Sequence, residues 1–199
     1  MNLLSLTLAL TLSVEWGQGP PSAAEAARMD APFERAPRWG ASYTSPSSGW
    51  SYRDEFHQIA GMVWIYADFD WSGIEGERAR IIYVARRLER RRDVADTVRW
   101  TDSDACPALT DRLRGFEAVP TPNLTIFGLD EAPDGSLPGR TLHGLHWTLW
   151  TDYLASQTDG APADVSMSSN AGAIAAWGNE TRAALEPCWR ETPPVPHSL

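Results

Sequence analysis

The sequence predicts an α+β domain with a mostly antiparallel sheet and two main helices bridged by one disulfide. Three observations lead to this prediction. Short segments rich in β-branched and aromatic residues recur between Ile59 and Met167, which is typical of strands. Two segments in which apolar residues repeat at helical spacing follow Ser103 and Asn170. Only two cysteines are present, one near the start of the first predicted helix and one at the end of the second.

The composition indicates one globular domain with irregular ends. The chain has 199 residues, of which 43% are hydrophobic and 22% are charged. Proline, glycine, alanine and serine are concentrated before residue 52, and the C-terminal end is rich in proline. We therefore divide the chain into a signal peptide (1–26), a poorly ordered linker (27–51), a single globular domain (52–190) and an irregular tail (191–199).

The signal peptide is predicted from an apolar run of twelve residues, Leu3 to Val14. This run is too short to cross a bilayer, which takes about 20 apolar residues, but it has the length of a signal-peptide core. Ala24-Glu25-Ala26 resembles a cleavage site, although the sequence leaves the actual site open. An N-terminal strand or buried helix is the alternative. Cleavage would leave no membrane span and a periplasmic or secreted protein.

The strands are predicted from their β-branched and aromatic content. Residues 59–69 form the first, and 124–127, 141–150 and 164–167 form later ones. Residues 80–88 fit a helical stripe through Ile81, Val84, Ala85 and Leu88, yet Ile-Ile-Tyr-Val favours a strand. We prefer a hairpin with 97–100, but the sequence alone does not decide between hairpin and helix for 79–99.

The two helices are predicted from caps and proline breaks. Ser103 caps the first, Pro107 lies in its first turn, and Pro120 ends it. Asn170 caps the second, and Pro187 ends it. Gly178 inside the second helix costs roughly 1 kcal/mol relative to alanine.

Cys106 and Cys188 are predicted to form the disulfide. Their separation of 82 positions fits neither a redox nor a zinc motif, so one structural bridge is the simplest use. It would clamp both helices over the sheet and, by closing a long loop, stabilise the fold by about 4–5 kcal/mol. A disulfide requires an oxidising compartment, which agrees with export. Two buried free thiols are the alternative.

Four short motifs carry a resemblance to other proteins. They are Asp104-Ala-Cys106-Pro107-Ala108-Leu109, Leu149-Trp150, Ser168-Ser169-Asn170-Ala171-Gly172 and Leu185-Glu186-Pro187-Cys188-Trp189. Over roughly residues 100–189 the chain is similar to small uncharacterised exported proteins of alphaproteobacterial type. The resemblance supports the disulfide and implies no particular activity.

Charge and composition exclude several function classes. The chain contains no lysine, which removes phosphate-loop, Schiff-base and Ser-x-x-Lys chemistry. The net charge of −9 argues against a nucleic-acid partner. The one basic cluster is Arg86, Arg87, Arg90, Arg91 and Arg92, which we interpret as a solvated strand or hairpin face. An anion or partner patch is the alternative.

Metal binding is expected to be absent, although two patterns deserve testing. His143-Gly-Leu-His146 would place its imidazoles on opposite faces of the predicted strand. Asp68, Asp70 and Ser72, followed by Gly73, resemble the start of a calcium loop, but the twelfth position is not an acid. A hairpin turn is favoured there, and no cofactor is predicted.

Catalysis has only weak candidates. Ser169 precedes a predicted helix N-terminus, and His57 or His146 could serve as its base, but Ser-Ser-Asn at this position is also ordinary capping chemistry. Paired carboxylates, Asp102 with Asp104 and Asp68 with Asp70, could cleave glycosides. The ten tryptophans could stack on sugars, although Trp64, Trp100 and Trp177 fall at predicted core positions. We expect Trp39, Trp50 and Trp71 in loops.

No ligand set or catalytic constellation stands out. The sequence therefore favours an exported, non-catalytic binding or cell-envelope accessory domain, whose partner is a protein or a small molecule. The alternative is a secreted or periplasmic hydrolase with a Ser/His or carboxylate site.

Overall fold

The computed structural model describes residues 22–33, 46–54, 56, 58–72, 79–120, 144–155 and 162–197. The strands are β1 (Ser48–Asp54), β2 (Ile59–Asp70), β3 (Arg80–Arg91), β4 (Val94–Asp102), β5 (Leu145–Ala155) and β6 (Pro162–Ser169). The helices are α1 (Ala23–Asp30), α2 (Pro107–Glu117) and α3 (Gly172–Leu185), and a 3-10 turn, η1 (Glu186–Cys188), follows α3. The described part of the chain thus has three α-helices where the sequence predicts two.

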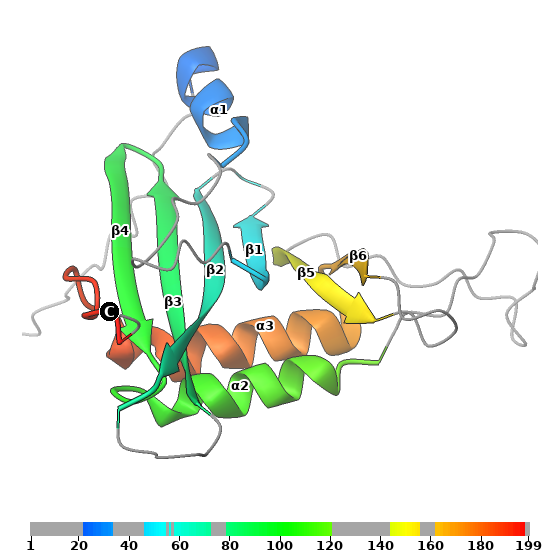
Figure 1. Ribbon diagram of the computed structural model, residues 1–199. Coiled ribbons are helices and arrows are strands. Elements are labelled where there is room, and N and C mark those ends of the chain that lie inside the picture. Colours follow the sequence, from blue (N-terminus) through cyan, green and yellow to red (C-terminus); the bar gives the residue numbers. More distant parts are fainter. Residues whose placement is uncertain are drawn as a thin grey trace, which may run out of the picture.

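The six strands form one antiparallel sheet in the order β4-β3-β2-β1-β5-β6, which confirms the predicted α+β class. Helices α2 and α3 lie beside each other and pack on one face of the sheet, and α1 lies near the turn between β3 and β4 (Figure 1). Among the described residues, no helix combines the length and the apolar character that a bilayer crossing requires.

Side chains alternate between the two faces of the sheet. On the first face, which we call the helix-covered face, strand residues pack against α2 and α3. The buried core there comprises Trp50, Tyr52, Val63, Ile65, Ala85, Trp147 and Leu149 from the strands and Leu109, Ile174, Ala175, Trp177 and Leu185 from the helices. On the opposite face, which we call the second face, Trp64, Tyr66 and Val84 form a smaller buried cluster.

Strand β1 lies at the centre of the sheet although its first four residues fall in the predicted linker. It pairs with β2 on one side and β5 on the other. Its Trp50, which we expected in a loop, is only 2% exposed because it points into the helix-covered core. Gly49 is required beside it, since a Cβ atom there would overlap the carbonyl oxygen of Val63 and the ring of Trp150. The folded unit therefore begins before residue 52.

The ambiguous segment after residue 79 is a hairpin, as we preferred. Strands β3 and β4 pair antiparallel through a turn at Arg92 and Asp93, and Asp93 adopts a positive φ of 58°. Aspartate tolerates this left-handed conformation better than most residues do. The predicted strand 141–150 is found from Leu145, and that at 164–167 lies within β6. The predicted strand 124–127 lies outside the described residues.

The helices begin slightly later than their predicted caps. Ser103 instead accepts a hydrogen bond at its hydroxyl oxygen from the backbone N–H of Tyr83, and Cys106 takes the N-cap position of α2. Helix α3 begins at Gly172, whose positive φ of 64° ends the preceding extended segment. A glycine is required at position 178 of this helix, because a Cβ atom there would overlap the ring of Trp147.

The disulfide Cys106–Cys188 is present, with 5.8 Å between its Cα atoms. Cys106 immediately precedes α2, and Cys188 ends the 3-10 turn after α3. The bridge therefore joins the start of one helix to the end of the other, as predicted.

Helix α1 occupies the boundary between the predicted signal peptide and linker. Ser22 caps it by accepting a hydrogen bond from the N–H of Glu25. The carboxylate of Glu25 accepts a hydrogen bond of 2.7 Å from the N–H of Asp93, and Arg28 pairs with Asp96 at 2.7 Å. Met29 is 1% exposed. These contacts dock α1 on the turn between β3 and β4.

The arginine cluster lies on the β3 hairpin, as expected, but two of its members are buried and not solvated. Arg87 and Arg90 are only 4% and 8% exposed. Arg87 pairs with Glu186 at 2.7 Å and stacks on Trp189. Arg90 stacks on the ring of Phe33, 4.6 Å from its centroid. Because side chains alternate along β3, its arginines reach both faces of the sheet and bind segments remote in sequence.

Candidate functional site

The structure separates the predicted catalytic serine and histidine. Ser169 of β6 pairs directly with Trp147 of β5, so both side chains lie on the helix-covered face. His146 is the neighbour of Trp147 along β5 and therefore points to the second face. The hydroxyl of Ser169 accepts a hydrogen bond from the N–H of Ala171, which is the capping-type contact we considered as the alternative. His57 lies outside the described residues, as does His143 of the His-x-x-His pattern.

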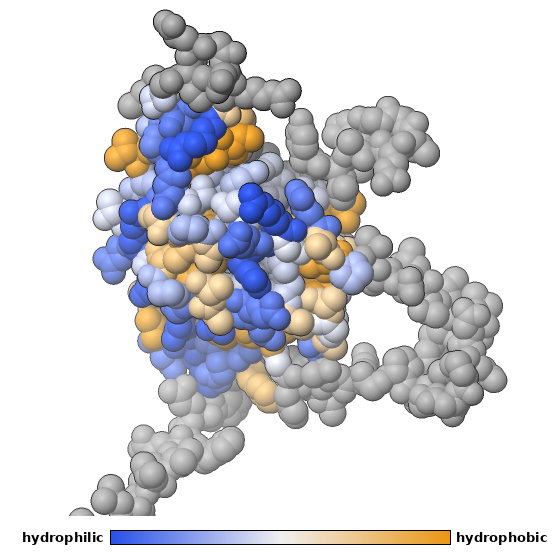
Figure 2. Space-filling view, turned by 90° about the horizontal axis from the view of Figure 1, so that it is seen from below, coloured by the Kyte–Doolittle hydropathy of each residue, from blue (hydrophilic) through white to orange (hydrophobic). Residues whose placement is uncertain are grey.

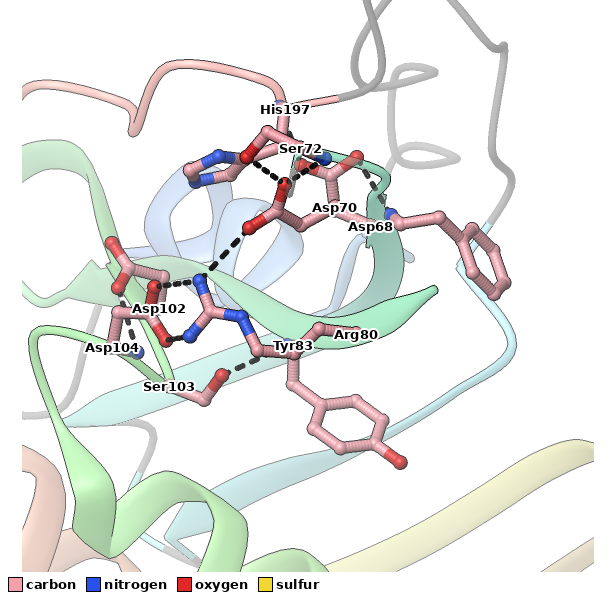
Figure 3. A network of polar contacts seen from close by, with 10 residues as sticks. Asp68, Asp70, Ser72, Arg80, Tyr83, Asp102, Ser103, Asp104 and His197 are labelled. Atoms are coloured by element: carbon pink, nitrogen blue, oxygen red, sulfur yellow. Dashed lines mark hydrogen bonds and ion pairs between the residues drawn. The ribbon is translucent and has the colours of Figure 1, made fainter. Parts of the chain in front are cut away.

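The predicted calcium ligands are bound by protein donors. Asp70 accepts hydrogen bonds from both the N–H and the hydroxyl of Ser72 and pairs with Arg80 (Figure 3). These contacts, Ser72 first and then Arg80, lower the pKa of Asp70 to about 2. Asp68 is 1% exposed and accepts backbone hydrogen bonds from Phe69 and His197. Across the described ranges, no three His, Cys, Asp or Glu residues gather as metal ligands.

The second pair of carboxylates also has structural partners. Asp102 accepts hydrogen bonds from the backbone N–H groups of Asp104 and Ala105 and forms an ion pair with Arg190. Asp104 binds Arg80 through both of its oxygens (Figure 3). The two side chains thus fix the connection from β4 to α2 and the start of β3.

A buried polar pair crosses three strands of the helix-covered face. The hydroxyl of Tyr52 on β1 donates a hydrogen bond of 2.5 Å to Glu89 on β3, passing over Gly61 of β2, where a Cβ atom would overlap the ring. Burial foremost, and then the charge of Glu89, raise the pKa of Tyr52. Burial acts to raise the pKa of Glu89 too, but hydrogen bonds from Tyr52 and Arg91 outweigh it and the pKa is lowered. Because Tyr52 and Glu89 are 2% and 4% exposed, we assign this pair to structure.

Several of the described tryptophans pack in the core. Trp64 and Trp177 are 5% and 6% exposed, as their predicted positions imply, and Trp100 stacks with Tyr66 at a centroid distance of 6.5 Å. Trp71 is 68% exposed just after β2, as we expected of a loop residue. Trp39 lies outside the described residues.

The candidate binding site is an apolar groove that the sequence does not reveal. It has a volume of about 440 Å³ and lies between the C-terminal end of α2 and the helix-covered face. Its apolar lining includes Ile65, Leu113, Phe116, Val119, Val165 and Met167. These residues come from β2, α2, β6 and the turn after α2, so no local sequence motif predicts that they line one groove. A volume of a few hundred Å³ with a mainly apolar lining is typical of small-molecule sites.

A few polar groups accompany this lining. Tyr83 reaches the groove from β3, and Ser48 and Thr151 line it from β1 and β5. The ring of Tyr83 points away from the polar network around Arg80 (Figure 3). Within the described part of the chain, its hydroxyl has no hydrogen-bond partner. Glu117 is the one charged residue among the lining residues that the structure describes.

The apolar character continues beyond the groove along the same strands. Phe69 and Ile81 are a cross-strand pair on the helix-covered face, and they are 37% and 46% exposed. Seen from below, the molecule carries hydrophilic residues through the middle of the view and apolar residues on either side (Figure 2). The helix side is thus neither uniformly polar nor one large apolar surface.

Comparison of the chain with protein-family models, with curated proteins and with solved structures finds no match in any of the three.

Proposed function

We propose that this chain is an exported binding domain that takes a small, largely apolar molecule into the groove between α2 and the sheet. The observation that carries the proposal is the groove itself. Its apolar walls would gain about 25 cal/mol for each Å² of apolar surface that a ligand removes from water. The separation of Ser169 from His146 by the sheet supports a binding role over a Ser/His hydrolase.

The polar groups of the groove define the ligand further. The hydroxyl of Tyr83, which has no hydrogen-bond partner among the described residues, can donate a hydrogen bond to, or accept one from, one polar group of the ligand. The carboxylate of Glu117 disfavours an anion in the groove. The ligand class is therefore a neutral or cationic apolar molecule with one hydrogen-bonding group.

A fluorescent probe tests this proposal. We expect the neutral dye N-phenyl-1-naphthylamine to bind with increased fluorescence, and Val165→Trp, which fills the groove, to weaken binding by about ten-fold or more. Tyr83→Phe keeps the shape and removes the hydroxyl, so it should weaken binding of an alcohol competitor more than that of a hydrocarbon. The measurement is a fluorescence titration with competitor displacement.

The matched control is Val94→Trp. Val94 is 52% exposed on the edge strand β4, so the same ring is added outside the groove and binding should not change. Equal affinities of the wild type, Val165→Trp and Val94→Trp would contradict the proposal. Binding of an apolar peptide but of no small molecule would assign the groove to a protein partner.

Export to the periplasm or the medium is the second half of the proposal. The disulfide supports it, since such bonds persist in oxidising compartments. Cleavage after Ala24-Glu25-Ala26 would remove Glu25, which binds the turn at Asp93. We therefore place the cleavage site before Ser22, so that α1 stays intact. Mass spectrometry of the protein from an exporting host should show this N-terminus and no free thiol. An uncleaved chain with two thiols would contradict export.

A further inference from the structure

A second cavity lies on the opposite face of the sheet, over β1 and β5. It has a volume of about 370 Å³. Its lining includes Ser51, Arg53, His146, Thr148 and Phe33, so it is far more polar than the groove. It uses none of the groove's residues and lies across the sheet from them.

The register of β1 and β5 explains how these side chains meet. Arg53 is directly opposite His146, and Ser51 is directly opposite Thr148. Trp50 and Tyr52 point into the helix-covered core, so alternation turns Ser51 and Arg53 to the second face. Directly opposed residues share a face and have Cβ atoms about 5 Å apart. Two cationic or N–H-donating groups and two hydroxyl groups therefore line one side of a single cavity.

A further arginine, Arg90, lies in the same cross-strand row as Arg53. Arg53 is opposite Ala60 on β2, and Ala60 is opposite Arg90 on β3. Arg90 itself is held by Asp96 and by the carbonyl oxygen of Ala31, at 3.0 and 2.7 Å. Arg90 does not line the cavity itself, but it stacks on Phe33, which does.

The acidic group at this cavity is turned to the backbone. One carboxylate oxygen of Asp54 accepts hydrogen bonds from the N–H groups of Gln58 and Ile59, at 2.6 and 3.0 Å. Arg53 has a contact of its own within the protein. A guanidinium carries five N–H donors, so it can keep such a contact and still bind an oxyanion.

Phe33 supplies an apolar wall. Its ring packs edge-on against Trp64, with 6.4 Å between centroids, and Arg90 stacks on it. A ligand in this cavity can therefore place an oxyanion at Arg53 and His146 and an apolar part against Phe33.

We propose that the cavity over β1 and β5 is a binding site for a small organic oxyanion, a carboxylate or phosphate monoester with a compact apolar group. Arg53 and His146 bind its charge, Ser51 and Thr148 donate hydrogen bonds to it, and Phe33 packs on the apolar group. This site stands independently of the groove, which disfavours anions.

Calorimetric titration with phenyl phosphate, benzoate and neutral benzyl alcohol tests the proposal on the full-length protein. We expect both anions to bind at least about ten-fold more tightly than the alcohol. Arg53→Met should reduce anion affinity by about ten-fold or more. His146→Gln should reduce anion affinity by a smaller factor. Because His146 is exposed, this second variant should keep the fold and still tests the proposal if Arg53→Met fails to fold.

Arg114→Met is the matched control. Arg114 on α2 has 75% of its side chain exposed, so its loss removes one positive charge outside the cavity and should leave anion binding unchanged. Equal binding by the wild type, Arg53→Met and His146→Gln, or no preference for anions over benzyl alcohol, would overturn the proposal. A groove variant such as Val165→Trp should bind phenyl phosphate normally, which separates this result from that for the groove.

Discussion

The two faces of the sheet are built by different means. On the helix-covered face, large apolar side chains from β1, β2 and β5 pack against α2 and α3, and the disulfide links the two helices. On the second face, Trp64, Tyr66 and Val84 form a smaller buried cluster among the described residues. Segments from both ends of the chain also contact this face. Phe33 packs on Arg90, and the N–H of His197 in the C-terminal tail donates a hydrogen bond to Asp68.

The contrast shows which interactions mainly stabilise the fold and which mainly determine where the terminal segments lie. Apolar burial is non-directional and additive in area, so the helix-covered core supplies most of the folding free energy. Charged hydrogen bonds are directional, so the arginines of the second face mainly fix where α1 and Phe33 lie. Arg90, for example, binds the carbonyl oxygens of Arg28 and Ala31 at 3.3 and 2.7 Å, just where α1 ends. Loss of an interaction on the first face should therefore be global, and on the second face local.

The largest expected effect comes from removing the disulfide. In the variant Cys106→Ala with Cys188→Ala, the unfolded chain regains the entropy of a loop that spans 82 positions. The free energy of unfolding should fall by about 4–5 kcal/mol. Urea denaturation followed by tryptophan fluorescence measures this change. The transition should stay cooperative, because both helices belong to the one core.

Reduction of the wild-type protein is the control for the two alanines. It should lower stability by a similar amount without changing any side chain that packs in the core. A loss below about 1 kcal/mol would show that the helix-covered face is held by packing alone. Separate unfolding of α2 and α3 would show that packing does not make the two helices one cooperative unit.

The same contrast explains what the sequence could predict. The helices after Cys106 and Ala171 are recognisable because their signals, apolar residues at helical spacing and proline breaks, are local. The β-branched run after residue 79 favours a hairpin without deciding against a helix. The disulfide is predicted because the chain has just two cysteines. Strand β1 has no such signal. Its Ser-Gly-Trp-Ser-Tyr-Arg sequence resembles a linker, and it becomes a central strand because β2 and β5 pair with it and α3 covers Trp50 and Tyr52.

The two cavities cannot be predicted from the sequence for a related reason. The groove draws side chains from five strands and α2, and the cavity over β1 and β5 depends on the register that places Arg53 opposite His146. Register is set by the assembled sheet and not by either strand alone. The sequence predicts that the arginines around β3 are solvated, and it misses the partners Glu25, Phe33 and Glu186 because these are remote in sequence.

A smaller and more local effect is expected for Arg90→Met. The methionine keeps an apolar stem against Phe33 but loses the ion pair with Asp96 and the hydrogen bonds to the end of α1. Global stability should fall by only about 1–3 kcal/mol, since Asp96 keeps its partner Arg28. Amide hydrogen exchange should instead show selective loss of protection in α1, while α2 and α3 remain protected.

Arg99→Met provides the comparison for this local effect. Arg99 lies on β4 with 40% of its side chain exposed, and its distance to Glu186 is 3.8 Å, so its removal should cost less than about 1 kcal/mol and leave α1 protected. If Arg90→Met instead lowered protection equally in all three helices, α1 would belong to the same cooperative unit as the helix-covered core. The two faces would then differ in chemistry but not in how they unfold, and the terminal segments would be part of the fold's stability as well as of its shape.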